Sequence, residues 1–438
     1  MAKSVSLIFD IGKTNKKLFL FDGALNIIEQ EYASFDETPD DEGFLSEDLN
    51  ALTKWIKHSV DKVLNNPKYD LKTINFSTYG ASLVHLDKDG NVIAPFYNYL
   101  KPFPEDLKAD FLKKHGAARD FPLANASPFM GFLNSGLQLY YLKYQKPEIF
   151  NQLHYSLHFP QYLSFLFTGK FSSEFTSLGC HTGLWDFENN SYAQWVKDEG
   201  FEKHLAPIQG SSKTFQTTIN GRSISIGLGV HDSSAALTSY IQKSTAPFAL
   251  ISTGTWNICL NPFNASELTA SELQNDCLNF LGTNGKSIKI SRLFLGQEFQ
   301  EQVMQLEAHF SCDKDYYKSV IYNKEFIPLI NNQHQLVYQY VYLKPERFGF
   351  NEQEKTNYNQ FTGFDQAYHQ LIHELTELQI ASLQLALGDS DVKTIYIDGG
   401  FTDNLLFIKM LTHKLPEFKI PPSKLASGSA LGAAMLLK

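Results

Sequence analysis

The stretch from residue 5 to residue 22 constrains the fold more than any other part of the chain. It reads VSLIFDIGKTNKKLFLFD, so a polar turn at residues 10–15 separates two apolar runs. The turn carries a carboxylate, a glycine and a hydroxyl beside open backbone N–H groups. Such turns bind phosphate through the backbone, and the carboxylate can hold a magnesium ion. We therefore expect a phosphate-binding β-hairpin with strands at residues 5–10 and 17–22.

The same turn must be distinguished from a P-loop, which requires the pattern GxxxxGK[ST] followed by a helix. Gly12, Lys13 and Thr14 resemble the end of that pattern, but Leu7 stands where its first glycine belongs. The segment after the turn is β-prone and has no helix cap. This favours the actin-like ATPase architecture, built from RNase-H-like domains. The expected phosphate contacts are Gly12, Lys13, Thr14 and Asn15, with Asp10 on the metal.

A second hairpin of the same kind is expected at residues 248–260, which read FALISTGTWNICL. Its small polar turn predicts further nucleotide contacts at Thr253, Gly254 and Thr255. Either hairpin alone also fits an ordinary β-turn that uses glycine for its positive φ. One hairpin in each half of the chain instead predicts two related domains that face one nucleotide.

Size and composition restrict the class of protein. A chain of 438 residues is too long for one core and suits two domains. Residues 209–223 are polar and rich in Ser, Thr and Gly, which predicts a boundary there and domains at 1–222 and 223–438. The net charge of −9 argues against nucleic acid as the main partner. No apolar run approaches the ~20 residues that a membrane span needs.

The four cysteines have no C-x-x-C spacing, so neither a zinc site nor a disulfide framework is indicated. The first strand begins so early that we expect no signal peptide. A cytoplasmic protein is the simplest expectation, and a homodimer is allowed.

Other elements follow from periodicity, caps and breakers. We expect strands at 27–32, 73–77, 224–230 and 394–398, a hairpin at 85–93, and helices at 46–64, 136–168 (with breaks at Pro147 and Pro160), 365–387, from 402 or 403 onward, and 427–434.

Asp232 is the acid that we single out for chemistry. It follows the strand at 224–230 and begins an Ala-rich helix, and ligands of open α/β sheets bind at that strand edge. Asp232 can instead be a plain helix cap. As a general base it would accept the proton of an attacking hydroxyl. A further strand runs into Gly399 and Gly400, where the backbone can approach a nucleotide closely.

These pieces together resemble the FGGY carbohydrate kinase family over nearly the whole chain. The matching segments, in order, are Asp10–Asn15, Leu86–Val92, Lys143–Phe150, Leu166–Lys170, Glu174–Thr176, Thr182–Asp186, Gly229–Ala236, Ser252–Trp256, Asp398–Gly400 and Gly428–Ala434. The resemblance implies two RNase-H-like domains around a central cleft, ATP and Mg²⁺ as cofactors, Asp232 as catalytic base, and Asp10 and Asp232 as metal ligands. The sugar contacts that it implies are Tyr79, Gly80, Glu174 and His231.

The pair His231–Asp232 and the turn before Trp256 resemble the rhamnulokinase and fuculokinase branches, which act on 6-deoxy-ketohexoses. This predicts ATP-dependent transfer to the C1 hydroxyl of L-rhamnulose or L-fuculose. Two departures concern the sugar side: residues 99–103 read YLKPF where the family often has Trp-x-Asp-x-Arg, and Gln161 replaces a common Asp. A pentulose kinase that phosphorylates C5 is therefore an alternative. An actin-like ATPase that acts on protein partners and a catalytically lapsed sensor are further alternatives.

Overall fold

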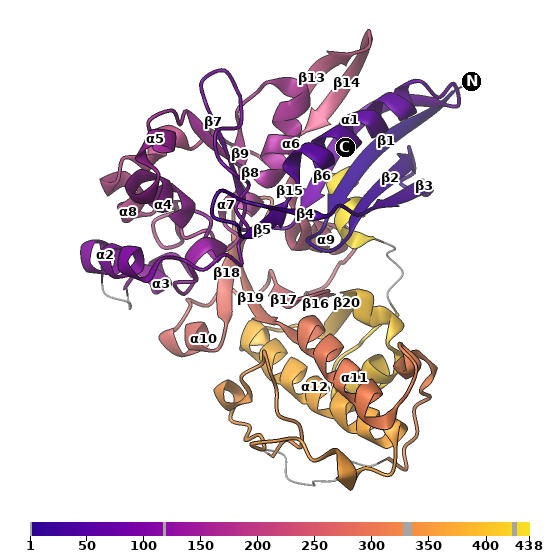
Figure 1. Ribbon diagram of the computed structural model, residues 1–438. Coiled ribbons are helices and arrows are strands. Elements are labelled where there is room, and N and C mark those ends of the chain that lie inside the picture. The colour runs from indigo at the N-terminus through magenta and orange to yellow at the C-terminus, as the bar shows by residue number, and fades with distance from the viewer. Residues whose placement is uncertain (1, 117–119, 327–334, 423–426) are drawn as a thin grey trace. The chain divides into compact units, whose positions relative to one another are not determined.

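The computed structural model describes residues 2–116, 120–326, 335–422 and 427–438, which form two compact units (Figure 1). The first unit contains Met1–Lys243, Asn279–Ser287 and Ser427–Lys438. The second contains Ser244–Leu278 and Ile288–Ala426. Both units are of mixed α/β type, as expected from the sequence.

The boundary between the units differs from the one expected at 222/223. That point lies inside a β-hairpin, where β13 (Thr214–Ile219) pairs antiparallel with β14 (Arg222–Gly227). Alternating Ser and Thr side chains suit a half-exposed strand as well as a linker, which is why composition alone misplaces the boundary. The strand expected at 224–230 and Asp232 therefore belong to the first unit.

The sheet of the first unit is built around the expected phosphate hairpin. β1 (Lys3–Ile11) pairs antiparallel with β2 (Lys16–Asp22), and β2 continues to β3 (Ile27–Ala33). On its other side β1 pairs parallel with β6 (Tyr69–Thr78). The order is β13-β14-β6-β1-β2-β3, and β15 (Val230–His231) also pairs with β6.

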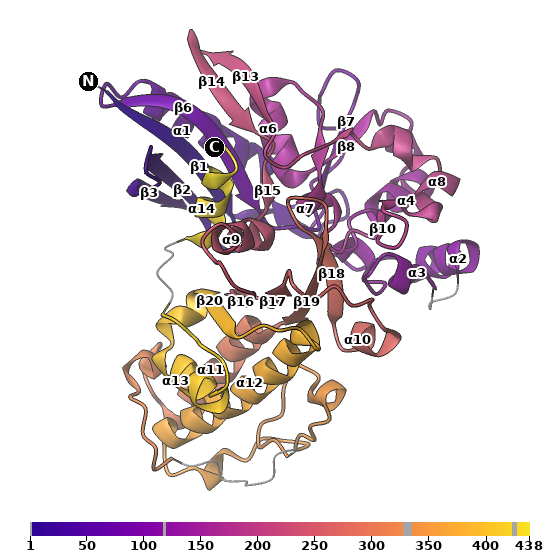
Figure 2. The ribbon, with the colours of Figure 1, turned by 180° about the vertical axis from the view of Figure 1, so that it is seen from behind.

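Helices cover both faces of this sheet. Alternate residues of β1 (Val5, Leu7, Phe9 and Ile11) join one apolar core with α1 (Leu49–Leu64) and α6 (Phe159–Thr168). Because successive side chains of a strand point to opposite faces, Asp10 faces the other side. There α9 (Asp232–Ile241) and α14 (Gly428–Met435) lie side by side (Figure 2). Gly432 permits this approach, since an added Cβ would lie 1.7 Å from the Ala235 carbonyl oxygen.

A largely helical region between β6 and β13 has its own core. Residues 136–168, expected to be helical, form α4 (Leu137–Gln145), α5 (Pro147–Phe150) and α6, but β8 (Tyr155–His158) interrupts them. β8 pairs with β7 (Leu83–Leu86), a partner that is distant in sequence and invisible to local pattern reading. Shorter elements of the first unit are β4 (Glu37–Pro39), β5 (Leu45–Glu47), α2 (Glu105–His115), α3 (Asp120–Ala124), β9 (Ser173–Glu174), α7 (Phe175–Leu178), β10 (Trp185–Asp186), β11 (Ser191–Tyr192), α8 (Gln194–Asp198) and β12 (Ile208–Gln209).

The second unit repeats the central sheet pattern of the first. β16 (Phe248–Thr253) pairs antiparallel with β17 (Asn257–Asn261) and parallel with β20 (Thr394–Gly399), as β1 does with β2 and β6. The order is β18-β19-β17-β16-β20. The remaining helices and strands are α10 (Ala270–Gln274), β18 (Cys277–Leu281, whose residues 279–281 are counted with the first unit), β19 (Ser287–Leu293, whose Ser287 is too), α11 (Leu295–Phe310), α12 (Phe364–Leu387) and α13 (Leu405–Lys414). The expected pair of related domains is confirmed.

Helix ends differ slightly from the sequence expectation. α1 begins at Leu49 because Asp48 caps it, and Leu45–Glu47 form a strand instead. α13 begins at Leu405, capped by Asn404, after a 3₁₀ turn at Gly400–Asp403. Within the described ranges, no helix has the length and apolar character of a membrane span.

Candidate active site

The expected phosphate turn lies between β1 and β2. The Gly12 N–H donates to the Asn15 carbonyl at 2.9 Å and closes the turn. An added Cβ at Gly12 would lie 3.1 Å from that carbonyl oxygen, so the tight turn favours glycine. Thr14 and Asn15 are exposed, whereas Lys13 is half-buried and pairs with Glu37 at 2.6 Å. The solvent-exposed part of the turn is therefore Thr14–Asn15.

A buried chain of polar groups supports this turn. The Lys16 ammonium donates to the Lys13 carbonyl at 2.9 Å and lies 2.7 Å from Glu47 Oε1. The Tyr79 hydroxyl donates to Glu47 Oε2 at 2.6 Å, and the Tyr79 N–H donates to the Ile11 carbonyl at 3.0 Å. Burial, together with the charge of Glu47, raises the pKa of Tyr79 well above its usual value.

Lys16 and Glu47 were not among the residues expected from the sequence. Lys16 is in phase with Leu18 and Leu20, whose side chains enter the core beside α1, so the alternation in β2 was the signal for a core-facing lysine. Lys17, which stands opposite Asp10 in the hairpin register, was not expected either.

The charge of Asp232 acts on Asp10 within the first unit. Burial raises the pKa of Asp10 to about 6, and the negative charge of Asp232 acts in the same direction, against the opposing charge of Lys17. Burial also raises the pKa of Asp232 to about 6. The Asp232 side chain is still 31% exposed, so a ligand can reach it. Its Oδ1 accepts the Ser233 N–H at 2.6 Å.

This pair suits a magnesium ion that keeps part of its shell as water and phosphate oxygens. Magnesium in phosphoryl-transfer sites is held by one or two carboxylates together with substrate phosphates. Lys17 offsets the negative charge of these two buried carboxylates only in part, and a divalent cation would neutralise the rest. Among the described residues, no three metal-binding side chains gather to form a complete protein cage.

His231 and Gly80 meet beside Asp232. The His231 Nε2 lies 3.2 Å from Asp232 Oδ1 and 3.2 Å from the Cys180 sulfur, and its Nδ1 lies 3.2 Å from the Ser234 hydroxyl. Burial lowers the pKa of His231 to about 4, so the ring is neutral at pH 7. An added Cβ at Gly80 would lie 2.8 Å from the Cys180 sulfur. The structure therefore brings Gly80, His231 and Asp232 together.

Aromatic rings line the same region. The Tyr79 ring packs 5.3 Å from Phe159 and 6.0 Å from Tyr99, measured between centroids. Burial raises the pKa of Tyr99 to about 12, and the charge of Asp232 contributes to that rise. Tyr99 thus occupies the neighbourhood of the expected base in the segment where the family's Trp-x-Asp-x-Arg pattern is absent. Two residues on, Lys101 is buried and pairs with Asp40 and Glu42 at 2.5 and 2.9 Å.

Glu174, expected as a sugar contact, is fully buried and caps α7. Its carboxylate accepts hydrogen bonds from the N–H groups of Thr176 and Ser177. The structure therefore gives it partners within the chain.

The expected nucleotide residues of the second unit lie together at one sheet edge. Thr253 and Gly399 are register partners at the ends of the parallel strands β16 and β20. The Thr253 hydroxyl donates to the Asp398 carbonyl at 2.6 Å and accepts the Phe401 N–H at 3.0 Å. Gly254, Thr255 and Gly400 are exposed beside them. Ligands of α/β sheets bind at this kind of edge.

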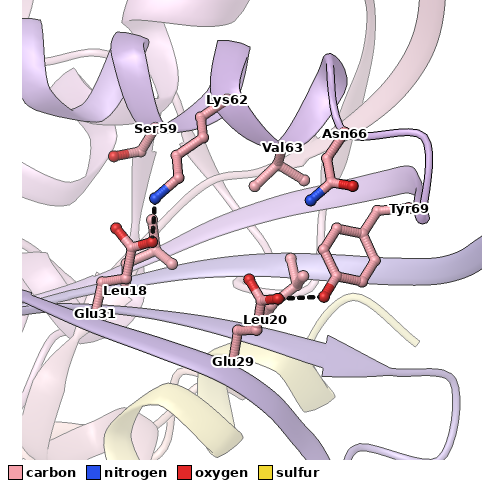
Figure 3. Close-up of a pocket in the computed structure, with 9 residues that line it drawn as sticks. All are labelled: Leu18, Leu20, Glu29, Glu31, Ser59, Lys62, Val63, Asn66 and Tyr69. Atoms are coloured by element: carbon pink, nitrogen blue, oxygen red, sulfur yellow. Dashed lines mark hydrogen bonds and ion pairs between the residues drawn. The ribbon is translucent and has the colours of Figure 1, made fainter.

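A small cavity lies elsewhere in the first unit, between α1 and the strands β2 and β3 (Figure 3). Its volume of ≈ 20 Å³ holds about one water molecule. Four of its polar side chains are already paired, Lys62 with Glu31 and Tyr69 with Glu29. This cavity is too small for a sugar.

Several curated proteins are similar to part of the chain. A rhamnulokinase from Yersinia pestis (strain Pestoides F) is 25% identical over 245 residues, covering 54% of this chain and 48% of that protein. A rhamnulokinase from Halalkalibacterium halodurans is 24% identical over 263 residues, which cover 58% of this chain and 55% of that protein. The chain therefore spans about half the length of the curated relatives that it matches.

Solved structures share the fold over the whole chain. A carbohydrate kinase from Novosphingobium aromaticivorans has a TM-score of 0.81 at 20% identity and covers 100% of this chain and 92% of its own. A xylulose kinase from Lactobacillus acidophilus has a TM-score of 0.80 at 15% identity, and the match covers 99% of this chain and 89% of the xylulose kinase. The expected actin-like, RNase-H-like fold class is thereby confirmed.

Family models match both halves of the sequence. The N-terminal domain of the FGGY family of carbohydrate kinases matches residues 5–231, and the FGGY carbohydrate kinase C-terminal domain matches residues 245–438. Together they leave only short stretches unmatched, so the chain belongs to the FGGY family of carbohydrate kinases.

Proposed function

We propose that this protein is an ATP-dependent ketose kinase in which Asp232 is the general base. The observation that carries the proposal is the pair of carboxylates, Asp10 and Asp232, whose pKa values burial raises to about 6 beside the phosphate turn. A carboxylate of this kind is ionised at pH 7 yet is a stronger base than an ordinary aspartate. Its partial exposure leaves room for a substrate hydroxyl.

In this mechanism the chain mainly positions groups and neutralises charge. When bound, Mg–ATP supplies the phosphoryl group and the cation that balances its charge. The backbone of the turn from Gly12 to Asn15 would bind phosphate, and Asp10 would hold the metal. As the oxygen of the sugar hydroxyl bonds to the γ-phosphorus of ATP and the bond from that phosphorus to the departing ADP breaks, Asp232 takes the hydroxyl proton. Thr253–Thr255 and Gly399–Gly400 are the further nucleotide contacts in the proposal.

The proposed substrate is a 6-deoxy-ketohexose such as L-rhamnulose or L-fuculose, phosphorylated at C1. Support comes from the rhamnulokinase relatives and from Tyr99, whose half-buried ring lies near Asp232 and offers an apolar wall to a methyl group. Such a wall discriminates weakly against a sugar that merely adds a hydroxyl. The fold neighbours include xylulose kinases, so a pentulose phosphorylated at C5 is the second candidate.

The test is a panel of ketoses with coupled detection of ADP, followed by NMR of the phosphorylated product. We expect turnover that requires both a ketose and Mg²⁺, with phosphate on C1 of a deoxy-ketohexose. Phosphate on C5 of a pentulose, together with no turnover of deoxy-ketohexoses, would overturn the proposal that the substrate is a deoxy-ketohexose. ATP turnover without sugar would favour an actin-like ATPase, and ligand binding without turnover would favour a lapsed sensor. Asp232→Asn is the matched negative control.

The four cysteines are free thiols, which supports the proposed cytoplasmic location. The homodimer stays a prediction that sedimentation equilibrium can test.

A further inference from the structure

The strongest unexplained feature is the hydrogen bonding of Glu174. Its fully buried carboxylate accepts four bonds: from the Thr176 N–H at 2.8 Å, the Ser177 N–H at 2.6 Å, the Thr176 hydroxyl at 2.7 Å and the Ser211 hydroxyl at 2.6 Å. A carboxylate offers about four lone-pair sites. The chain's own donors fill them all, which leaves no acceptor on Glu174 for a sugar hydroxyl.

The Thr176 hydroxyl links this carboxylate to the expected catalytic strand. Its single proton is donated to Glu174, so its oxygen acts as an acceptor toward the His231 N–H at 3.0 Å. The direction of these hydrogen bonds is therefore fixed: the His231 N–H donates to the Thr176 hydroxyl, which donates to the Glu174 carboxylate. Such aligned hydrogen bonds polarise and strengthen one another in a buried site.

These hydrogen bonds fix the backbone of His231, the residue that precedes Asp232. His231 ends β15, pairs with Thr78 of β6, and precedes Asp232 directly. The segment after α7 also holds the His231 ring, because the Cys180 sulfur lies 3.2 Å from Nε2. The backbone and the ring of His231 are thus both anchored by one short segment, residues 174–180.

We propose that Glu174 and Thr176 are positioning residues for Asp232, and that they set the rate of phosphoryl transfer rather than the affinity for sugar. The inference rests on the proposed kinase function. A displacement of about 1 Å in a reacting group can cost roughly 100-fold in rate. A residue that binds sugar equally in ground and transition states would instead change KM alone.

The kinetic test compares two substitutions at Thr176. Thr176→Val keeps the shape and removes the hydroxyl, and we expect kcat to fall about 10- to 100-fold with the ketose KM within about twofold. Thr176→Ser keeps the hydroxyl and should stay within about threefold of the wild type. Glu174→Gln should also lower kcat. If Thr176→Val does not fold, Glu174→Gln is the variant that tests the proposal. A raised KM with unchanged kcat in Glu174→Gln would overturn the proposal and make Glu174 a sugar ligand.

Thr182→Val is the matched control, because the buried Thr182 hydroxyl, like that of Thr176, donates one hydrogen bond and accepts one: it donates to the Leu178 carbonyl at 2.6 Å and accepts the Leu184 N–H at 3.1 Å. It should lower thermal stability as Thr176→Val does and leave kcat unchanged. Equal losses of kcat in both variants would mean a merely structural role for Thr176 and would refute the inference.

A readout without substrate separates this inference from the proposed function. Amide hydrogen exchange at His231 should accelerate about 10-fold or more in Thr176→Val and stay slow in Thr176→Ser and Thr182→Val. A wild type that is inactive on every ketose would refute the proposed function. Unchanged exchange at His231 in Thr176→Val would refute the positioning role by itself.

Discussion

Replacing Lys16 by methionine should destabilise the first unit strongly. The Lys16 and Glu47 side chains are only 7% and 4% exposed, and their charged atoms lie 2.7 Å apart. Methionine preserves the length of the side chain but removes its charge. The Glu47 carboxylate would then stay buried with only the Tyr79 hydroxyl as a partner, and the Lys13 carbonyl in the phosphate turn would lose a donor.

The expected magnitude follows from this unpaired charge. Removing one partner of a buried ion pair costs about 3–5 kcal/mol, because the other charge loses its compensation. The total stability of a domain is about 5–15 kcal/mol, so Lys16→Met should fold with a much lower urea midpoint. The double variant Lys16→Met/Glu47→Gln should recover most of the loss, since the amide accepts from Tyr79 and carries no charge.

Tryptophan fluorescence during urea unfolding is a suitable assay, because Trp55, Trp185 and Trp195 all lie in the first unit. The matched control is Lys62→Met, which removes a lysine from an exposed pair whose side chains are 59% and 39% exposed. Its cost should stay below about 1 kcal/mol. The reasoning is refuted if Lys16→Met costs no more than Lys62→Met, or if the double variant is no more stable than Lys16→Met.

Four further outcomes test the site. Asp232→Asn should lower kcat roughly 10²–10⁴-fold while nucleotide binding, measured by calorimetry, persists; near-normal turnover would reduce Asp232 to a helix cap. Because burial raises the pKa of Asp232 to about 6 and only the ionised form accepts a proton, wild-type kcat/KM should fall below pH about 6, and a flat profile would contradict this. The pKa of Asp10 is about 6 in the fold and 3.8 without it, so the stability that protonation contributes is lost as pH rises through about 6. Asp10→Asn should therefore be more stable than the wild type by up to about 3 kcal/mol near pH about 8 and by only about 0.5 kcal/mol near pH about 4, in thermal unfolding; a gain that grows toward acid would be inconsistent. Gly399→Ala should cost about 1–3 kcal/mol, since its Cβ would lie 1.8 Å from the Thr253 carbonyl oxygen at a φ of +89°, whereas Gly400→Ala meets nothing within 4 Å and should be nearly neutral; urea unfolding followed by circular dichroism, which reports on both units, compares the two variants.

The sequence alone determined the elements whose signals are local. The hairpin at 5–22 and the hairpin at 248–260 are confirmed, because apolar strands around a small turn specify pairing between neighbours in the chain. The long helix at 365–387 is confirmed as α12 because its apolar periodicity extends over many turns. Asp232 indeed begins a helix at the end of a strand.

Tertiary structure decided everything that depends on partners distant in sequence. β8 exists because β7 pairs with it, and the polar segment at 209–223 forms a hairpin because β14 joins β6. The raised pKa of Asp10 depends on burial that no local pattern reveals, with a smaller contribution from the charge of Asp232, 222 positions away along the chain. The roles of individual polar residues were the least predictable: Glu174 was expected to face a sugar, but the fold surrounds it with four donors. Local propensity specifies how the backbone turns, whereas the environment of a buried charge is set only when distant segments pack around it.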